Sequence, residues 1–515
     1  MGQTAVRLGS GDIPFPVVYQ QNKSKLLRLL KQGKQDLVEL SAWTMADDFM
    51  SYVLEWDFLK FADETYPTPR KKTEAPIWFL IACQLVLKIN VEPSFKGLKT
   101  LLKSGPILSR VGFNVAQQIG FNGKNRYERQ TPCHEDTVLK FFRDSNRVEI
   151  QSWFLRKLQG WFLKQSAFAT EGVFILDQTH LVVPDNEHYE DAVLMPVDEH
   201  GQLYKGTTEQ IRDYKWHRCY TLSVLLHLQE DRKSFHVTGY HFGPGNTDEL
   251  PQAQEILRDF VHEHGKGIIK LLIVDRGYVD GKFVTSCKRD YSIDVLLPLK
   301  TNMQQHQDAI ELSKQDDVKW EDLSDPEQYN NMENNKPYLL KDACIIEDIE
   351  LWDTCKQKLF TVIIRDEQGC GNGKTSQIKH FVLATTKDFG SAFKVYQHYR
   401  VRTRVEECFR QFKNIWLIHG FSSPHPSLLE SHIAFVLLTY SLLNFYLRKT
   451  GQADRAQQFV STLKRQRHEL DKRIAAYSGN VFGLFGVKEY LQIVASLDEE
   501  QRQKFIDSLE AINQT

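Results

Sequence analysis

Two aspartates stand at the carboxyl ends of separate apolar runs, where α/β enzymes commonly expose reactive groups. Asp177 ends the run Val173–Asp177, and Asp275 ends the run Ile268–Asp275. Runs of this length and composition predict buried β-strands. Two carboxylates brought together at one edge of a sheet offer oxygen ligands to a hard divalent cation. A carboxylate after a strand also commonly begins a turn or caps a helix, so the pair alone leaves a structural role open.

A third acidic position lies in a strongly basic segment. Residues 394–413 contain six basic residues and two acidic ones, Glu406 and Glu407. On a continuous helix, at about 100° per residue, four polar residues share an arc about 60° wide beside an apolar face: Tyr399, Arg402, Glu406 and Lys413. A solvated helix face with i,i+4 pairs is the ordinary explanation of such a stripe. The local excess of positive charge instead favours binding to a phosphate backbone, with one acid as a metal ligand beside it.

The strands and helices that must position these residues can be read from the hydrophobic pattern. Three further runs predict strands: Tyr220–Leu228, Ser234–Phe242 and Asp294–Leu299. Asn246 and Glu249 have the spacing of a capping box at the start of a helix, Glu249–His264, and a direct role of this segment in the site is the alternative. A long helix that carries Glu406 is expected from Gly390 to about Trp416.

Composition limits the class of protein. The 515 residues include 65 Lys and Arg and 66 Asp and Glu, so any nucleic-acid-binding surface has to be a local patch. The 8 Cys are spread singly without a C-x-x-C pair, which argues against a zinc ribbon or a disulfide framework and suits a reducing cytosol. The apolar run Ile433–Tyr446 is shorter than the ~18 residues typical of a membrane span. We therefore expect a buried core helix there, no membrane partner and no signal peptide.

The spacing of the basic segment resembles that of a known family. The pattern Tyr399-x2-Arg402-x3-Glu406-x6-Lys413 matches the Y-x2-R-x3-E-x6-K signature of insertion-sequence DDE transposases, in the insertion-sequence-four group that includes the Tn-five transposase. Asp177 in ILDQT and Asp275 in IVDRGY resemble the first and second catalytic aspartates of that family, and Gly245-Asn246-Thr247 resembles the segment between them. The resemblance covers about residues 174–447.

For the fold, the resemblance implies an α/β protein with a ribonuclease-H-like catalytic core. The core would comprise residues 166–300 and 380–450, interrupted by a β-rich insertion at 301–379. It would be flanked by a helical N-terminal DNA-binding region, residues 1–165, and a helical C-terminal region, residues 451–515.

For the activity, the resemblance implies a DNA transposase that cuts transposon ends and joins them to target DNA, through a hairpin intermediate. Asp177, Asp275 and Glu406 would bind two Mg²⁺ ions, with Mn²⁺ able to substitute. The expected partners are double-stranded DNA, both terminal repeats and target, and a second copy of the chain on DNA. The expected location is the bacterial cytoplasm, associated with the nucleoid. The expected DNA contacts are Tyr399, Arg402, Lys413, Arg410, Lys215 and Arg276, and a plain surface role explains the last two equally well.

Other acidic residues near these motifs have a structural explanation. Glu407 adjoins Glu406 but projects about 100° away from it on a helix, so the signature selects Glu406. The triplet His134-Glu135-Asp136 has the residue types of a metal site, yet a helix start explains it better. The remaining acids are interpreted as caps and turns: Asp185, Asp248 and Asp280.

Some basic and aromatic residues also have two explanations each. The basic clusters 23–34 and 70–72 fit a DNA-binding region, and a solvated helix face explains them as well. Trp320 and Trp352 lie in the expected insertion, where members of the resembled family hold a flipped base, but core packing is the preferred explanation for both.

Two other functions remain open at this point. The first is a transposase-derived DNA-binding protein that does not cut DNA. The presence of all three acids argues against this function. The second is a metal-dependent nuclease of the same fold that acts without strand transfer. Formation of hairpins or joining of ends would separate a transposase from such a nuclease.

Overall fold

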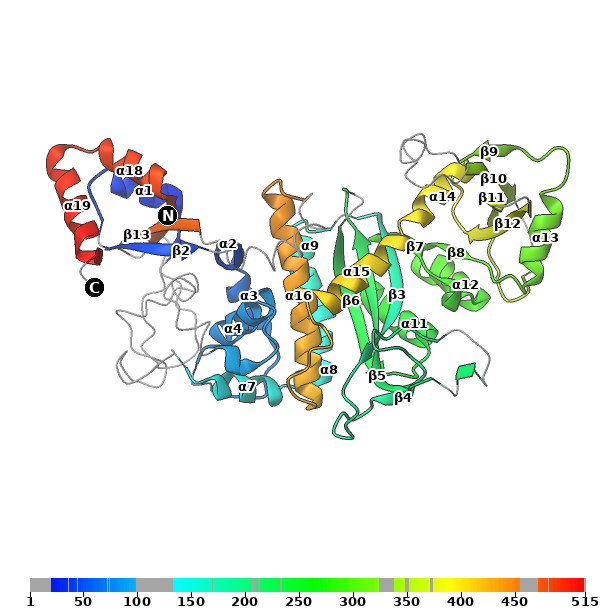
Figure 1. Ribbon diagram of the computed structural model, residues 1–515, viewed down its shortest axis with the longest axis horizontal. Helices are drawn as coiled ribbons and strands as arrows, with labels where there is room; N and C mark the ends of the chain where they lie inside the picture. Colours follow the sequence, from blue (N-terminus) through cyan, green and yellow to red (C-terminus); the bar gives the residue numbers. More distant parts are fainter. Residues whose placement is uncertain are drawn as a thin grey trace. The chain divides into compact units, whose positions relative to one another are not determined.

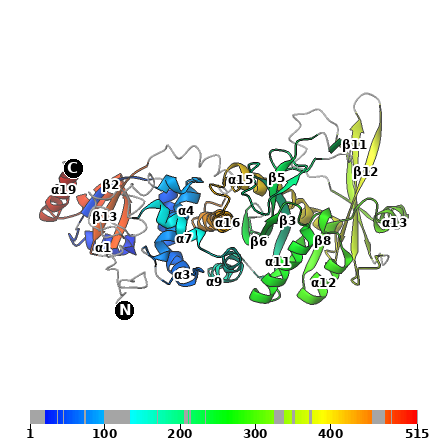
Figure 2. The ribbon, with the colours of Figure 1, turned by 90° about the horizontal axis from the view of Figure 1, so that it is seen from below.

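A computed structural model describes residues 20–35, 37–43, 45–71, 73, 75–98, 133–168, 170–204, 210–211, 214–231, 234–323, 338–347, 352–370, 374–453, 471–479 and 481–513. These residues form two compact units. Unit 1 comprises the described residues of Met1–Trp153, Glu187–Glu190 and Asn414–Thr515, and unit 2 those of Phe154–Asn186 and Asp191–Lys413. Each unit contains a β-sheet of its own (Figures 1 and 2).

A ten-stranded mixed sheet forms the centre of unit 2, so the α/β class expected from the sequence is confirmed. The order along the sheet is β4-β5-β3-β7-β8-β12-β11-β10-β9, and β6 also pairs with β5. The pairs β3–β7 and β7–β8 are parallel, and the other pairs of neighbours are antiparallel. The strands are β3 (Gly172–Val182), β4 (Val193–Met195), β5 (His217–Leu228), β6 (Phe235–Pro244), β7 (Ile269–Ile273), β8 (Asp294–Pro298), β9 (Trp320–Asp322), β10 (Tyr338–Glu347), β11 (Phe360–Cys370) and β12 (Lys374–Thr385).

Five of these strands follow the chain order predicted around the two aspartates. After β3 come the hairpin of β5 and β6, the helix α11 (Glu249–His264), β7, the helix α12 (Gly281–Tyr291) and β8. The two helices pack on the sheet beside each other, as Figure 2 shows. The parallel strands are buried on both faces, which explains why Phe174–Leu176 and Leu271–Ile273 are apolar without alternation.

The caps of these two helices are aspartates. Asp248 caps α11 by accepting a hydrogen bond from the Leu250 backbone N–H at 3.3 Å. Asp280 caps α12 and accepts from the Phe283 N–H at 2.7 Å. The expected cap of α11, Asn246, is therefore wrong, because the chain still turns at 244–247 and the helix begins only after Asp248.

The segment expected as a β-rich insertion continues the same sheet. Its antiparallel strands β9 to β12 join the central strands where Leu383–Thr385 of β12 pairs with Leu296–Pro298 of β8. The sequence did not predict the helix α13 (Gln304–Leu312) that precedes them. Only His306 and Ala309 of this helix are buried, so its sequence shows little hydrophobic periodicity.

Helices make up much of unit 1, and the long helix α16 (Pro426–Lys449) is central among them (Figure 1). It packs against α2, α4, α7 and α8, and by length and composition alone it could cross a membrane. The whole of its apolar window is buried, as expected for a core helix. The sequence had placed this helix in the catalytic core, whereas the structure places it in unit 1. The other helices of this bundle are α2 (Met45–Glu55), α3 (Phe58–Thr65), α4 (Ile77–Ile89), η1 (Phe95–Gly97), α7 (Glu135–Arg143) and α8 (Arg147–Ser152). The next two helices, η2 (Trp153–Leu158) and α9 (Gln159–Lys164), belong to unit 2 apart from Trp153.

The two ends of the chain form one four-stranded sheet in unit 1, with the order β1-β14-β13-β2. Val38 of β2 and Leu26 of α1 share an apolar cluster with Phe485, Tyr490 and Ile493 from the other end of the chain. The two flanking regions, expected to be helical, thus also contribute two strands each, which the sequence did not predict. The elements are β1 (Gln20–Gln21), α1 (Lys23–Leu30), β2 (Leu37–Trp43), β13 (Asp471–Ser478), β14 (Val481–Gly486), α18 (Val487–Ala495) and α19 (Glu499–Asn513).

Candidate active site

The register of the parallel strands β3 and β7 places Asp177 and Asp275 side by side in unit 2. Ile175 of β3 pairs with Ile273 of β7, and each aspartate lies two residues farther along its strand direction. The Asp177 side chain is 11% exposed and the Asp275 side chain 39% exposed. Asp275 follows the end of β7, whereas β3 continues to Val182, so the expectation that Asp177 ends its strand is wrong. Two neighbouring strands thus carry one deeply placed and one accessible carboxylate.

A guanidinium group lies between these carboxylates. Arg402 Nη2 donates to Asp275 Oδ2 at 2.7 Å and to Asp177 Oδ2 at 3.2 Å. Its Nη1 lies 3.9 Å from Glu406 Oε1, and the Glu406 side chain is 74% exposed. The three acids singled out in the sequence therefore surround one cation, two of them in direct contact with it.

A break in the expected long helix turns Arg402 toward the acids. The helix α14 (Ala392–Arg400) ends before Val401, and α15 (Thr403–Asn414) begins after Arg402. Backbone hydrogen bonds there link residues three apart, from Arg402 to Tyr399 and from Val405 to Arg402, both at 2.9 Å. Such a turn is tighter than an α-helix. The prediction of a single continuous helix from Gly390 to Trp416 is therefore wrong. The four polar residues of the predicted arc, about 60° wide, consequently do not lie on one continuous helix.

The environment of Asp177 disfavours its charged form. Burial raises the pKa of Asp177 to about 6, although Arg402 and a hydrogen bond from the Gln178 backbone N–H act in the opposite direction. Asp275 and Glu406 add to the rise, because like charges nearby favour the protonated acid. A cation in this space would relieve that repulsion.

The donor set fits a divalent cation of the Mg²⁺ kind. Carboxylate oxygens are the ligands such hard ions prefer, and Asp177, Asp275 and Glu406 supply them from three elements. The guanidinium of Arg402 shows that a positive charge is accommodated between them. Glu407 has a different environment, since it accepts two hydrogen bonds from Arg410 at 2.6 and 2.7 Å, which lower its pKa.

Tyr399 and Arg276 lie beside the acids on a shared aromatic contact. The centroids of the Tyr399 and Phe381 rings lie 5.5 Å apart. The Arg276 guanidinium lies over the same Phe381 ring, 5.5 Å from its centroid. Burial raises the pKa of Tyr399, and the charges of Asp275 and Asp177 reach it as well. Tyr399 is therefore a neutral hydrogen-bonding group close to the carboxylates.

The other expected DNA contacts have different surroundings. Lys413 Nζ donates to the His200 backbone carbonyl at 2.7 Å, and burial lowers its pKa to about 8. Arg410 is paired with Glu407 on the same helix, and Lys215 is exposed just before β5. The structure brings Tyr399, Arg402 and Arg276 to the acids, and it places these three elsewhere.

The tryptophans and basic clusters of the sequence are engaged in structural contacts. The Arg365 guanidinium lies over the Trp320 ring at 3.6 Å and forms a bidentate ion pair with Asp342. Trp352 is half-buried in the segment before β11. Lys23 of α1 pairs with Glu489 at 2.8 Å, and Arg70, in the loop between α3 and α4, pairs with Asp144 at 2.6 Å. Of the two basic clusters, only Lys72 lies outside the described residues.

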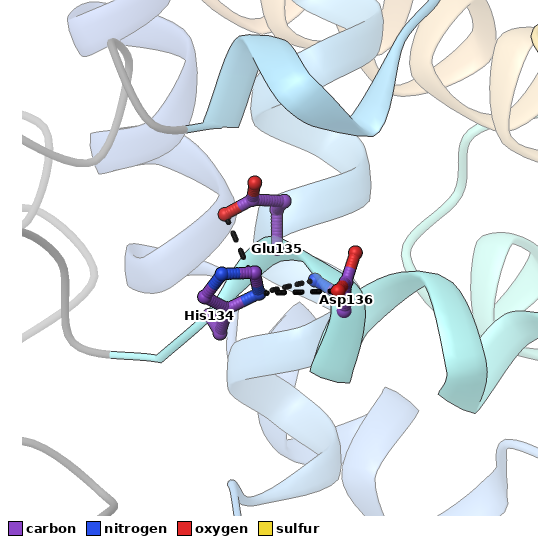
Figure 3. Close-up of side chains that lie close together, drawn as sticks. All are labelled: His134, Glu135 and Asp136. Carbon is purple, nitrogen blue, oxygen red and sulfur yellow. Dashed lines mark hydrogen bonds and ion pairs between the residues drawn. The ribbon is translucent and has the colours of Figure 1, made fainter.

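The triplet His134, Glu135 and Asp136 forms the start of α7, as the sequence indicated (Figure 3). His134 Nδ1 accepts a hydrogen bond from the Asp136 backbone N–H at 3.2 Å, which caps the helix. It lies 3.6 Å from Glu135 and 3.5 Å from Asp136. The acids in the first turn complement the helix dipole, so their proximity has a structural cause.

Two residues near the acids were not among the predicted site residues, although a site role for the segment that contains Glu249 was left open. The Glu249 carboxylate lies against Gly277, where a Cβ atom would be 1.4 Å from Glu249 Oε1. Burial raises the pKa of Glu249 to about 7, and the nearby Asp177 and Asp275 raise it further. Tyr278 is fully buried, and its pKa is raised by burial and then by the charges of these same acids. The one available signal was the extra acid in the GNTDE segment.

Comparison with known proteins identifies the family. The family model described as "Transposase DDE domain" matches residues 169–442, more than half of the 515-residue chain. The chain belongs to this family of DDE transposases, and the match spans all three acids and Arg402.

Similarity to individual proteins is low. No curated protein matches the chain. A cryo-EM structure of the piggyBac transposase synaptic complex with hairpin DNA has 10% sequence identity and a TM-score of 0.35, over 87% of this chain and 82% of that chain. This likeness is too low to bear on the fold described above.

Proposed function

We propose that this protein cuts the ends of a transposable element and joins them to target DNA, with a divalent cation held by Asp177, Asp275 and Glu406. One observation carries the proposal. Within the segment matched by the transposase family, these acids surround a single positive group, the Arg402 guanidinium. Three carboxylates converging on a cation at the carboxyl edge of a sheet are what phosphoryl transfer needs.

The core of unit 2 supports a ribonuclease-H-like assignment. The strand order β6-β5-β3-β7-β8, with β5 and β6 antiparallel to their neighbours and the others parallel, is a five-stranded mixed sheet. Asp177 lies on its central strand and Asp275 follows the neighbouring strand. The helix α15 then brings Glu406 to the same edge from a segment beyond the insertion.

The chemistry is displacement at a DNA phosphorus atom. In nicking, the oxygen of water bonds to phosphorus, the bond to the 3′ oxygen breaks, and that oxygen takes up a proton. The products are a 3′-hydroxyl and a 5′-phosphate. The same 3′-hydroxyl can then attack a phosphorus atom of the opposite strand to give a hairpin, or of target DNA to give joined ends. In each case the bond from that phosphorus to its own 3′ oxygen breaks, and this oxygen takes up the proton that the attacking hydroxyl loses. A bound divalent cation such as Mg²⁺ or Mn²⁺ supplies Lewis-acid stabilisation of charge at the reacting phosphate.

The protein's own residues bind and orient the DNA in this proposal. Arg402, Tyr399 and Arg276 lie beside the acids and offer cationic or hydrogen-bonding contacts to phosphate oxygens. Lys413, Arg410 and Lys215 extend the set of candidate contacts farther along the surface. The partners would be double-stranded terminal repeats and target DNA, bound by two copies of the chain, in the bacterial cytoplasm at the nucleoid.

A cleavage assay tests the function. The substrate is a labelled duplex that carries the element's own terminal repeats, incubated with Mg²⁺ or Mn²⁺. We expect nicked and hairpin products from the wild type, and at least about a hundredfold loss in Asp177→Ala, Asp275→Ala and Glu406→Gln, since each removes a metal ligand. Glu407→Gln is the matched control, because Glu407 pairs with Arg410 instead.

Each of the other possible outcomes of this assay supports a different function or a different third ligand. Cutting that survives Glu406→Gln but is lost in Glu407→Gln would move the third ligand by one residue. Tight binding to the ends without any cutting would favour a DNA-binding protein derived from a transposase. Nicking without hairpins or joined ends would favour a metal-dependent nuclease of the same fold.

A further inference from the structure

The first residue of α11 directs a carboxylate toward the turn that follows β7. The Glu249 carboxylate occupies the space beside Gly277, two residues after Asp275, and only a glycine leaves room for it there. A side chain at the first turn of a helix ordinarily extends into solvent, where the helix dipole favours its negative charge. Glu249 is instead half-buried, and the charges of Asp177 and Asp275 reach it.

This arrangement gathers more negative than positive charge. Asp177, Asp275, Glu249 and Glu406 contribute four carboxylates, whereas the guanidinium groups of Arg402 and Arg276 contribute two positive charges beside them. Lys300 reaches Glu249 electrostatically but is exposed. Like charges in a partly buried site repel unless a cation compensates them. The imbalance therefore points to a further positive ion at this place.

A buried hydroxyl group beside the acids provides an independent sign of a missing ligand. Tyr278 is 0% exposed, and its Oη has no hydrogen-bond partner among the described residues. The charges of Asp177, Glu249 and Asp275 all reach this hydroxyl, and Tyr278 follows Asp275 by three residues in the turn where Gly277 contacts Glu249. Buried hydroxyl groups are nearly always paired, and an unpaired one marks a position where a polar group is bound in the working protein.

We propose that Glu249 is a fourth carboxylate ligand of the cation site formed by Asp177 and Asp275. The inference rests on the proposed function, because it requires a divalent cation at those aspartates. Glu249 lies on a different element from the three acids of the signature, and so it completes the oxygen shell from the α11 side. Gly277 is then needed for access of this side chain, since a methyl group there would displace the carboxylate.

Titration of Mn²⁺ into the full-length protein without DNA, followed by calorimetry, tests the proposal. We expect Glu249→Gln to weaken Mn²⁺ binding by about tenfold or more. Gly277→Ala keeps the charge but moves the carboxylate, and we expect the same loss. Glu255→Gln changes an exposed glutamate of the same helix and should bind Mn²⁺ like the wild type. Circular dichroism checks that each variant is folded.

The relaxation of water protons by bound Mn²⁺ separates a ligand from a distant charge. Loss of a ligand oxygen opens a position for water, so the relaxivity per bound ion should rise in Glu249→Gln. Weaker binding with unchanged relaxivity would overturn the assignment of Glu249 as a ligand. Wild-type affinity in Glu249→Gln, with binding lost in Asp275→Asn, would overturn the inference alone. A wild type that binds no Mn²⁺ would overturn it together with the proposed cation site.

Discussion

Arg402 provides the positive charge that holds the site together without a metal. Its Nη2 contacts both Asp177 and Asp275, and the side chain is only 15% exposed. A divalent cation at the same carboxylates has to compete with these contacts. Arg402, which we expect to bind DNA, therefore also competes with a metal ion for the carboxylates of Asp177 and Asp275.

We predict that Arg402→Gln binds Mn²⁺ about tenfold more tightly than the wild type in the absence of DNA, because the competing charge is gone. Cleavage of DNA should nevertheless fall, since the phosphate contact is lost. Without metal the variant should be less stable, because a buried carboxylate loses its partner. Calorimetric titration and thermal unfolding with and without Mn²⁺ measure these effects. Arg410→Gln, which breaks only an exposed pair with Glu407, is the control, and equal Mn²⁺ affinity in Arg402→Gln and wild type would contradict the prediction.

Residue types and spacing, together with the resemblance to the transposase signature, selected Asp177, Asp275 and Glu406, which the structure places around the Arg402 guanidinium. The same sequence could not show that Arg402 points inward, because this depends on a tight turn of residues 399–405 within an otherwise helical pattern. Glu249 and Tyr278 were missed for another reason. Glu249 comes near the acids only when α11 packs beside the turn after β7, which no local pattern encodes. Tyr278 follows Asp275 by three residues, but the sequence does not show that its hydroxyl group is buried.

At the scale of elements, a buried lysine joins two helices of unit 1. Lys88 of α4 donates from Nζ to Nδ1 of His432 on α16 at 2.9 Å, and His432 Nε2 donates to the Leu417 carbonyl at 3.2 Å. Burial lowers the pKa of Lys88 to about 7, and burial also lowers the pKa of His432. Both side chains are therefore favoured in their neutral forms inside the bundle.

This pair makes the stability of the bundle depend on pH. The unfolded chain keeps the Lys88 proton up to the ordinary pKa of about 10.4, whereas the folded chain releases it near pH 7. Because the unfolded state binds more protons in that window, the contribution of Lys88 to the free energy of unfolding rises with pH, by up to about 1.4 kcal/mol per pH unit. Lys88→Met should thus be more stable than the wild type at pH 6, and its advantage should shrink toward pH 9.

Denaturant unfolding of both proteins at several pH values measures this difference. The variant also loses the hydrogen bond to His432, but that loss shifts the difference by a constant amount and leaves its slope with pH unchanged. Lys60→Met, which changes an exposed lysine of α3, should show no such slope. A difference between Lys88→Met and the wild type that is constant with pH would contradict the prediction.

Elements with strong apolar runs were predicted well, and those defined by distant partners were not. The strands β3, β5, β6, β7 and β8 and the helix α11 lie where their sequence patterns indicated. The strands β2 and β13 were missed, because each becomes a strand through pairing with the other, between Trp43 and Asp471 at one end and Leu37 and Tyr477 at the other. A pattern within either segment contains no information on that partner.

At the scale of the whole molecule, the small sheet of unit 1 exists only when both ends of the chain are present. We predict that a chain truncated after Gly451 leaves β2 and α1 without their apolar partners, among them Phe485 and Tyr490. Amide hydrogen exchange at Val38 and Leu40 should then accelerate by at least about a hundredfold, because the pairing strand is gone. The amides of β3 in unit 2 serve as the internal control and should stay protected. Unchanged protection at Val38 would show that the N-terminal segment folds alone.

Synthesis on the ribosome gives this sheet an order of assembly. The strand β2 leaves the ribosome early, yet β13, its neighbour in the sheet, begins only at Asp471. At about 5–20 residues per second, the waiting time is on the order of tens of seconds. During that interval the first strands remain unpaired while the sheet of unit 2 can already form. A chain that stops before Asp471 would therefore carry the acids of the candidate active site without β13 and β14, the strands that complete the small sheet.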